Sequence, residues 1–394
     1  MRVILATMGT LGDHLPLIGL GSSLASLGLP VTIACNEAMH PLAHRAGLTV
    51  SELGARLGHQ EASATPSAWD HWKLQPQSVQ WIPDWQALIR RQVQALVDLL
   101  RPEDLLIAGR NLPLVPLIAA ATGCRWIELG LNCGAMIDYG ALEAIHPTPP
   151  WKQDLNQLEL ELRQEWLAGR DRSFDHPPCL RLHAVPANFV PQRYPQLQAV
   201  PTGFWTYDDP AWSSWQPDPI LQKLLEGERA PLVLAFSSQP LIEPITVLNQ
   251  HLRVAELLER PLVVVRGWAF RNIRLQHPLL VMQEPMPFRP LFQAAAAVFI
   301  HAGMGTMAAA LEAGCRIVAE PYGNDQFMNT AQLIRQGLGL GVSPKRFDPA
   351  AVAAVLRTRL EGPVTPACPA DWFEGLDHAG ALIQACLDRR RQDF

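Results

Sequence analysis

The residues best placed to do chemistry lie between Phe299 and Gln326, in the sequence FIHAGMGTMAAALEAGCRIVAEPYGNDQ. Small residues from Ala302 to Thr306 predict a turn between an apolar strand and an alanine-rich helix. Backbone N–H groups in such a turn can approach an anion at the helix N-terminus. His301 at the strand exit can donate to a phosphate, and Asp325 with Gln326 follows the next strand. The pattern predicts a site for a nucleotide that carries a hydroxyl-rich group.

Each of these residues also has a purely structural interpretation. An isolated His301 would more often be a strand-end histidine, and Asp325 with Gln326 could cap the helix that follows. Ser238, in the strand-ending sequence Phe236-Ser237-Ser238, could bind phosphate or cap a helix. The functional interpretation becomes the stronger one for His301 because Gly303, Gly305 and Thr306 accompany it.

A second candidate group follows the first strand, in the sequence Gly9-Thr10-Leu11-Gly12-Asp13-His14. The two glycines predict a tight turn, but their spacing does not match the dinucleotide fingerprint GxGxxG. Asp13 is either a helix N-cap or a general base, and His14 is the alternative base. Burial would raise the pKa of an aspartate toward the range that a base needs at neutral pH.

The elements that must position these groups alternate between strand and helix in both halves of the chain. In the first half we predict strands at 2–6, 31–34, 105–108 and 126–129, and helices at 15–27, 86–100 and 112–121. In the second half we predict strands at 232–236, 262–265, 298–301 and 317–320, and helices at 245–258, 305–313 and 326–336. This pattern predicts an α/β fold with two doubly wound parallel sheets, each with its ligand edge at the strand C-termini.

Between the halves, the sequence WTYDDPAWSSWQPDP from Trp205 to Pro219 is rich in residues that break regular structure. We therefore expect an N-terminal domain at 1–205, a linker at 206–219 and a C-terminal domain at 220–375. A final helix at 376–394 is expected to pack back on the N-terminal domain.

Composition narrows the class of protein. Hydrophobic residues make up 48% of the 394 residues and the net charge is -5, which gives no reason to expect a nucleic-acid partner. Seven cysteines without metal-ligand spacing argue against a disulfide framework and a structural zinc, and fit a cytoplasmic location. No apolar run is long enough to span a bilayer, while peripheral membrane contact and the oligomeric state stay open.

Together the motifs resemble the bacterial branch of the family 1 nucleotide-sugar glycosyltransferases, which includes antibiotic aglycone, sterol and rhamnolipid-type enzymes. GTLGDHLP resembles the family's GTxGDxxP, and HAGMGTMAAALEAG resembles HGGxGTxxxALxAG. EPYGNDQFMNTAQLIRQGLG resembles PxxxDQxxNAxxxxxxGxG, and Pro287 with Leu291-Phe292 resembles VP(H/Q)xxLF. The resemblance covers nearly the whole chain and implies the GT-B fold, with its two Rossmann-like domains facing a cleft.

The resemblance also implies roles for individual residues. Asp13 matches the base that deprotonates the acceptor, and Asp325 with Gln326 matches the pair that binds the donor sugar. The matches to the diphosphate-binding positions are Ser238, His301, Gly303, Gly305 and Thr306. Met286 and Pro287 are expected near the nucleotide base, and four tryptophans of the N-terminal half near an apolar acceptor: Trp69, Trp72, Trp81 and Trp85.

Several departures from the family pattern limit what it implies. Ala302 replaces a common glycine, and His14 replaces a residue that is usually apolar. Ala309 stands where plant members have the glutamate that holds the ribose. Uridine and thymidine diphosphate therefore both stay open as the donor's nucleotide.

We predict an inverting glycosyltransferase that moves a hexose from a UDP- or dTDP-sugar to a hydroxyl of an apolar or amphipathic small-molecule or lipid acceptor. The sequence offers no DxD-type carboxylate pair, so we expect no required metal or other cofactor. A nucleotide-sugar 2-epimerase of the same architecture, and a nucleotide-binding protein without transferase activity, are the alternatives. A nicotinamide dehydrogenase fits poorly because the GxGxxG spacing is missing.

Overall fold

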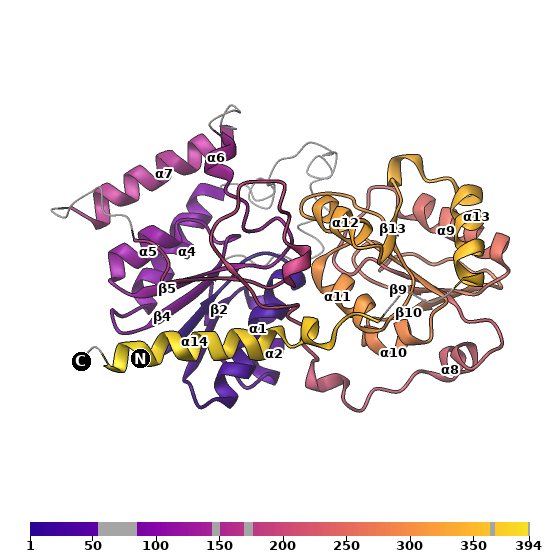
Figure 1. The fold of residues 1–394 in the computed structure, drawn as a ribbon, viewed down its shortest axis with the longest axis horizontal. Coiled ribbons are helices and arrows are strands. Elements are labelled where there is room, and N and C mark those ends of the chain that lie inside the picture. The colour runs from indigo at the N-terminus through magenta and orange to yellow at the C-terminus, as the bar shows by residue number, and fades with distance from the viewer. Residues whose placement is uncertain (54–84, 144–149, 169–175, 363–366, 393–394) are drawn as a thin grey trace. The chain divides into compact units, whose positions relative to one another are not determined.

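The structure is a computed structural model of the chain, and it describes all residues except 54–84, 144–149, 169–175, 363–366 and 393–394 (Figure 1). The described chain forms two compact units. The first holds the residues up to Tyr207 together with those from Glu374 onward, and the second runs from Asp208 to Phe373. Among the described residues, no helix has the length and apolar character needed to cross a bilayer.

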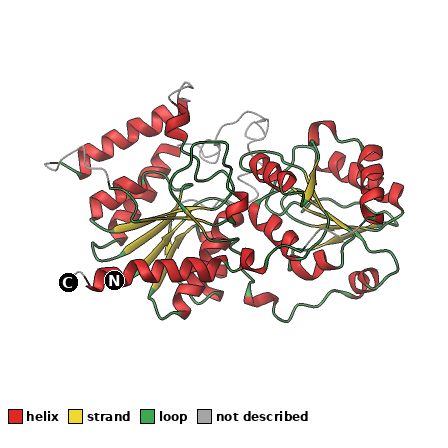
Figure 2. Cartoon of the chain, in the orientation of Figure 1, coloured by secondary structure: helices red, strands yellow, loops and turns green. Residues whose placement is uncertain are grey.

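The first unit is built on a parallel sheet with the strand order β3-β2-β1-β4-β5-β6-β7. Its strands are β1 (Val3–Ala6), β2 (Val31–Cys35), β3 (Thr49–Glu52), β4 (Leu105–Gly109), β5 (Arg125–Gly130), β6 (Leu180–His183) and β7 (Val200–Pro201). β1 is buried along its whole length because helices cover both faces of the sheet (Figure 2).

Alternate residues of β1 face two different cores. Ile4 and Ala6 belong to a cluster with α4 (Trp85–Leu99), α5 (Val115–Thr122) and α7 (Pro150–Trp166). Val3 and Leu5 belong to a second cluster with α1 (Leu11–Ser26), α2 (His40–Arg45) and α14 (Gly375–Gln392). The short helix α6 (Tyr139–Glu143) precedes α7.

The last helix of the chain, α14, completes the core of the first unit. It follows the second unit in sequence, yet it packs against α1 (Figure 1). Its buried side chains Ala379, Ile383 and Leu387 join the same cluster as Val3 and Leu5. The first unit is therefore assembled from two segments that are far apart in sequence.

The second unit contains a six-stranded parallel sheet with the order β10-β9-β8-β11-β12-β13. Its strands are β8 (Leu232–Ala235), β9 (Leu262–Val265), β10 (Leu280–Gln283), β11 (Ala297–Ile300), β12 (Ile317–Ala319) and β13 (Gly339–Gly341). Its helices are α8 (Pro219–Leu225), α9 (Pro244–Leu258), α10 (Phe288–Gln293), α11 (Met304–Glu312), α12 (Gln326–Arg335) and α13 (Pro349–Glu361).

The predicted α/β class with two parallel sheets is confirmed, while several element boundaries differ. α1 begins at Leu11 rather than at residue 15, because Thr10 caps it and the Gly12-Asp13 pair lies in its first turn. α5 begins at Val115 rather than at residue 112, because Leu114 before it has a left-handed backbone with a φ of 62°.

Candidate functional site

Left-handed backbone conformations mark the loops at the carboxyl edge of the second sheet. Five non-glycine residues of the described chain have a positive φ, and three of them follow β8, β11 and β12: Ser237, Ala302 and Asn324. These strands are neighbours in the sheet, so their loops open at one edge. An L-residue in this region is strained by roughly 1–2 kcal/mol, and such strain collects at functional sites. This edge is the candidate donor site.

The turn between β11 and α11 brings together the residues predicted to bind phosphate. Gly303 caps α11, and a side chain there would overlap the His301 imidazole. A Cβ on Gly305 would instead meet no atom within 4 Å. The N–H groups of a helix's first turn have no acceptor within the helix, and the macrodipole favours an anion beside them. Thr306 is the third residue of this turn and is buried.

His301 is a neutral hydrogen-bonding group at this turn. It is 7% exposed, and burial lowers its pKa to about 4, against the opposing effect of the Ala235 carbonyl. Its Nδ1 atom makes no hydrogen bond with good geometry to any described residue. An imidazole in this state can donate one hydrogen bond to a phosphate but carries no charge at neutral pH.

The loop after β8 is held close to the loop after β9. Trp268 donates its backbone N–H to the Ser237 carbonyl at 2.9 Å, and a side chain on Gly267 would overlap that carbonyl. Ser238, the predicted phosphate contact, lies half-buried in this turn. After β10, Pro287 caps α10 and Met286 is buried beside it.

Asp325 ties two of the loops together. Asn329 donates to the Asp325 carboxylate at 2.6 Å and to the Ala302 carbonyl at 3.0 Å, which joins the start of α12 to the strained turn. Burial raises the pKa of Asp325, and the bond from Asn329 opposes that shift. One hydrogen bond of the Asp325 carboxylate is therefore used within the protein, where it helps to hold the two loops together.

Gln326 uses its side-chain amide inside the protein. Its Oε1 atom accepts from the N–H groups of Tyr322 at 2.8 Å and Gly323 at 3.2 Å. Its Nε2 atom donates to Gln239 at 2.7 Å, which links the loops after β8 and β12. The structure thus gives Gln326 a positioning role, and the predicted contact to a donor sugar stays a prediction.

A buried histidine–glutamate pair in the second unit was missed by the sequence analysis. His251 in α9 and Glu320 after β12 are 0% and 1% exposed, and His251 Nε2 lies 2.5 Å from Glu320 Oε1. Nδ1 of His251 lies 2.8 Å from the Val247 carbonyl, so Nδ1 carries a hydrogen. Tyr322 donates to the other carboxylate oxygen at 3.3 Å. The two residues are 69 positions apart in sequence, and no local pattern could have paired them.

In the first unit, Asp13 is an integral part of the first turn of α1. Its Oδ2 atom accepts from the Thr10 backbone N–H at 2.8 Å and from the Thr10 hydroxyl at 3.4 Å. Thr10, not Asp13, is the N-cap, and the two residues form a capping box. Gly9 has a φ of 115°, and a side chain there would overlap the Asp13 carboxylate. The half-buried carboxylate is thus held in one place.

His14 is fully buried behind Asp13. Its Nδ1 atom donates to the Thr10 carbonyl at 2.8 Å, which leaves Nε2 as an acceptor. The Asn36 amide lies 3.4 Å from Nε2, and burial lowers the pKa of His14 to about 4. His14 is therefore neutral at physiological pH and has no exposed surface.

Two asparagines near this turn were also missed. Asn36 follows β2 and Asn111 follows β4, and the Oδ1 atom of each is buried without a hydrogen-bond partner among the described residues. Asn111 donates to the Met8 carbonyl and, at 3.3 Å, to the Thr7 hydroxyl. Both side chains therefore brace the loop that carries Asp13.

Three of the four tryptophans predicted to contact the acceptor lie outside the described residues. Trp69, Trp72 and Trp81 fall in the segment 54–84, and Trp85 is the first residue of α4. Their proposed role stays a prediction. In the described chain no group of three or more His, Cys, Asp or Glu side chains is arranged to hold a metal ion.

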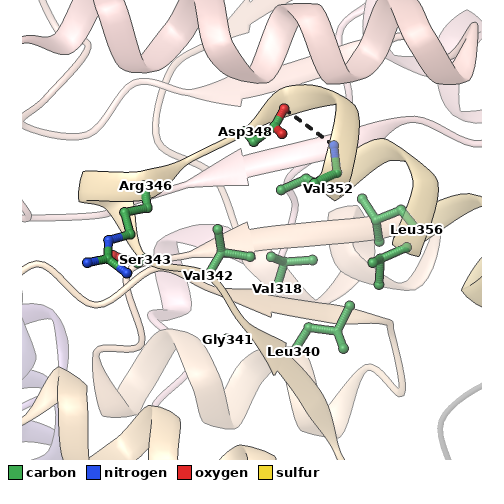
Figure 3. Close-up of a pocket in the computed structure, with 11 residues that line it drawn as sticks. Val318, Leu340, Gly341, Val342, Ser343, Arg346, Asp348, Val352 and Leu356 are labelled. Carbon is green, nitrogen blue, oxygen red and sulfur yellow. Dashed lines mark hydrogen bonds between the residues drawn. The ribbon is translucent and has the colours of Figure 1, made fainter.

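A cavity of about 380 Å³ opens beside β13 and α13 in the second unit (Figure 3). Aliphatic side chains such as Val318, Leu340 and Val352 line it, and Asp348 at its edge caps α13 through the Ala350 N–H at 2.9 Å. None of the predicted donor-site residues lines this cavity.

Comparison with known proteins shows which proteins have a similar sequence and a similar fold. No family model matches the sequence. The chain is 28% identical to O-mycaminosyltylonolide 6-deoxyallosyltransferase of Streptomyces fradiae, over 92% of this chain and 90% of that protein. The chain is similar to named glycosyltransferases and has their GT-B fold. The resemblance on which the sequence analysis rested is thereby confirmed.

Solved structures support the assignment of this chain to the GT-B fold. A calicheamicin glycosyltransferase matches with a TM-score of 0.67 and 18% identity, over 99% of both chains. A spinosyn rhamnosyltransferase in complex with thymidine diphosphate matches with a TM-score of 0.65 and 16% identity, over 98% of this chain and 100% of that one. At such identities the likeness concerns the fold.

Proposed function

We propose that the protein transfers a hexose, with inversion at the anomeric carbon, from a nucleoside diphosphate sugar to an acceptor hydroxyl. The second unit holds the donor and the first unit supplies the base. The observation that carries the proposal is the turn after β11, where a left-handed Ala302 and a bare Gly305 expose the first turn of α11. The backbone N–H groups there, together with neutral His301, stabilise the departing diphosphate.

Asp13 is the residue we assign as general base. Its carboxylate is half-buried and fixed by Thr10, whereas the His14 imidazole has no exposed surface and a pKa near 4. A group that takes a proton from a substrate must reach it within hydrogen-bond distance. His14 is thus assigned to hold the turn through the Thr10 carbonyl. Sequence position in the GTxGD motif supports the same choice.

The acceptor we propose is an apolar natural-product alcohol. The relative from Streptomyces fradiae is named for a tylonolide derivative and a deoxyallosyl group, which is an acceptor and donor pair of this kind. A neighbouring structure holds thymidine diphosphate, so dTDP-sugars belong in the first donor panel beside UDP-sugars. We propose that no metal ion takes part.

The donor site is tested by comparing two glycine substitutions. Gly305→Ala adds a methyl group that meets no protein atom within 4 Å, so the melting temperature without ligand should not change. Binding of UDP or dTDP, measured by calorimetry, should weaken at least tenfold because the methyl group occupies the space of the diphosphate. Gly380→Ala in α14, where the nearest atom is 3.5 Å away, is the matched control and should bind normally. Equal nucleotide affinity in both variants would overturn the donor site.

The base is tested by Asp13→Asn, which keeps the shape of the capping box. Transfer should fall by roughly a hundredfold to ten-thousandfold, while nucleotide affinity stays at the wild-type value. Product is detected by mass spectrometry over a panel of polyketide, sterol and lipid alcohols, and its anomeric configuration by NMR. Full transfer by the Asp13→Asn protein, or a product with retained configuration, would contradict the mechanism.

A further inference from the structure

We propose that Cys179 and Cys386 form a reversible disulfide, which makes the contact of α14 with the sheet of the first unit a covalent one. Cys179 lies directly before β6, and Cys386 lies in α14. Their Sγ atoms are 3.7 Å apart although the residues are 207 positions apart in sequence. This modification site is independent of the transferase reaction.

The geometry requires only a small movement. A disulfide has an S–S length of about 2.05 Å, so the two sulfur atoms must approach by roughly 1.7 Å, which is on the scale of a side-chain rotation. Cys179 is exposed and Cys386 is half-buried, so a small reagent can reach the pair. Four of the other five cysteines are buried: Cys35, Cys124, Cys133 and Cys315.

The surroundings of the pair give the two thiols different roles. Arg125 places its Nη2 atom 2.8 Å from Cys386 Sγ and 3.3 Å from the Cys386 carbonyl. A guanidinium at this distance favours the thiolate, which is the nucleophilic form. The hydrogen bond with Cys386, and then burial, raise the pKa of Cys179 against a smaller opposing effect of Arg125. Cys386 is therefore the attacking sulfur, and Cys179 retains its proton until the second step.

The oxidant we assign is a low-molecular-weight disulfide of the glutathione type. The Cys386 thiolate attacks one sulfur of this reagent and expels the other as a thiolate, which leaves a mixed disulfide on the protein. Cys179 then loses its proton and attacks Cys386 Sγ, expelling the second small thiolate. The protein loses two protons and two electrons, which convert one small disulfide into two thiols. Excess small thiol reverses both steps.

The crosslink closes a loop that contains the whole second unit. Because a crosslink between such distant residues restricts the unfolded chain strongly, oxidation should raise the melting temperature of the first unit by roughly 5 °C. The reduced protein keeps α14 in place through packing and the hydrogen bonds from Arg125, so reduction lowers this temperature without unfolding the protein.

The test uses the full chain in its reduced form, treated with oxidised glutathione and then alkylated. Digestion and mass spectrometry should give one linked peptide pair that contains Cys179 and Cys386, and the pair should disappear after dithiothreitol. Cys179→Ser and Cys386→Ser should each abolish the linked pair and the shift in melting temperature. Cys368→Ser, which removes a half-buried thiol of the second unit, should leave both unchanged.

Three outcomes would overturn the proposal. The first is stable glutathionylation of either cysteine without a linked pair, and the second is alkylation of both thiols after oxidation. The third is a linked pair with the same melting temperature in the oxidised and reduced proteins, which would refute the stabilising role. The first two are read on the wild-type chain, so they do not depend on how well a variant folds.

Discussion

Replacing His251 by Phe should destabilise the second unit by about 3–5 kcal/mol, because it leaves the buried Glu320 carboxyl group without its partner. Glu320 is 1% exposed and lies beside the imidazole at 2.5 Å. Three phenylalanine rings surround the imidazole, with centroids 4.7 to 6.0 Å from it. Water cannot easily replace the lost hydrogen bond in these surroundings.

Glu320→Gln should cost only about 1 kcal/mol, since a neutral amide can satisfy the same atoms. His251 keeps its Nδ1 hydrogen on the Val247 carbonyl, so its Nε2 atom can accept from the new amide. The Gln oxygen can accept from Tyr322, as the carboxylate does now. A large loss in this variant would show that the charge itself is needed.

The double variant His251→Phe with Glu320→Leu completes a double-mutant cycle, which measures the coupling between the two residues. Glu320→Leu alone should also cost about 3–5 kcal/mol, whereas an apolar pair should come within about 2 kcal/mol of wild type. The coupling free energy is then about 4 kcal/mol or more, far above the scatter expected for independent sites. Urea unfolding followed by circular dichroism measures each value from the midpoint at a common slope. Additive single effects would refute the reasoning.

Three further substitutions probe the two site loops. Burial lowers the pKa of His301 and His14 from 6.5 to about 4. The stability that each neutral imidazole contributes is therefore full above pH 6.5 and is lost as the pH falls toward 4, by about 3 kcal/mol for each imidazole. His301→Gln should flatten that loss in thermal melts of the second unit. Asp325 has a raised pKa, so its charged form opposes folding once the pH exceeds that pKa. Asp325→Asn should therefore raise the melting temperature at pH 7 but not in acid. A rise at every pH would exclude the charge of Asp325 as the cause. Gly303→Ala should destabilise the second unit by roughly 1–3 kcal/mol through its clash with His301, and unchanged urea unfolding would contradict the close packing.

The sequence predicted the two sheets because buried parallel strands form short apolar runs. β1, β8 and β11 are buried throughout and lie within two residues of their expected positions. β13 was not predicted: it is a three-residue edge strand, Gly339–Gly341, whose glycines lack the side chains that give a strand its pattern. Edge strands pack on few neighbours, so their sequences carry little signal.

The site was predictable where its residues are close in sequence. The turn from His301 to Thr306 has a local signature, because glycine, helix start and strand end follow one another. Ala302 shows the limit of that signature, since its left-handed backbone explains the family's usual glycine only once φ is known. The bond from Gln326 to Gln239 joins residues 87 positions apart, and only the folded chain brings them together.

The placement of α14 sets an order on how this protein can be made. During synthesis the second unit is complete once Phe373 has emerged, but the first unit still lacks Ala379, Ile383 and Leu387 from its core. The sheet of the first unit must therefore wait, with apolar side chains beside α1 uncovered, until α14 leaves the ribosome. The core of the first unit is completed only after the second unit has been made, and its uncovered apolar surface is the part of the nascent chain most in need of protection from aggregation.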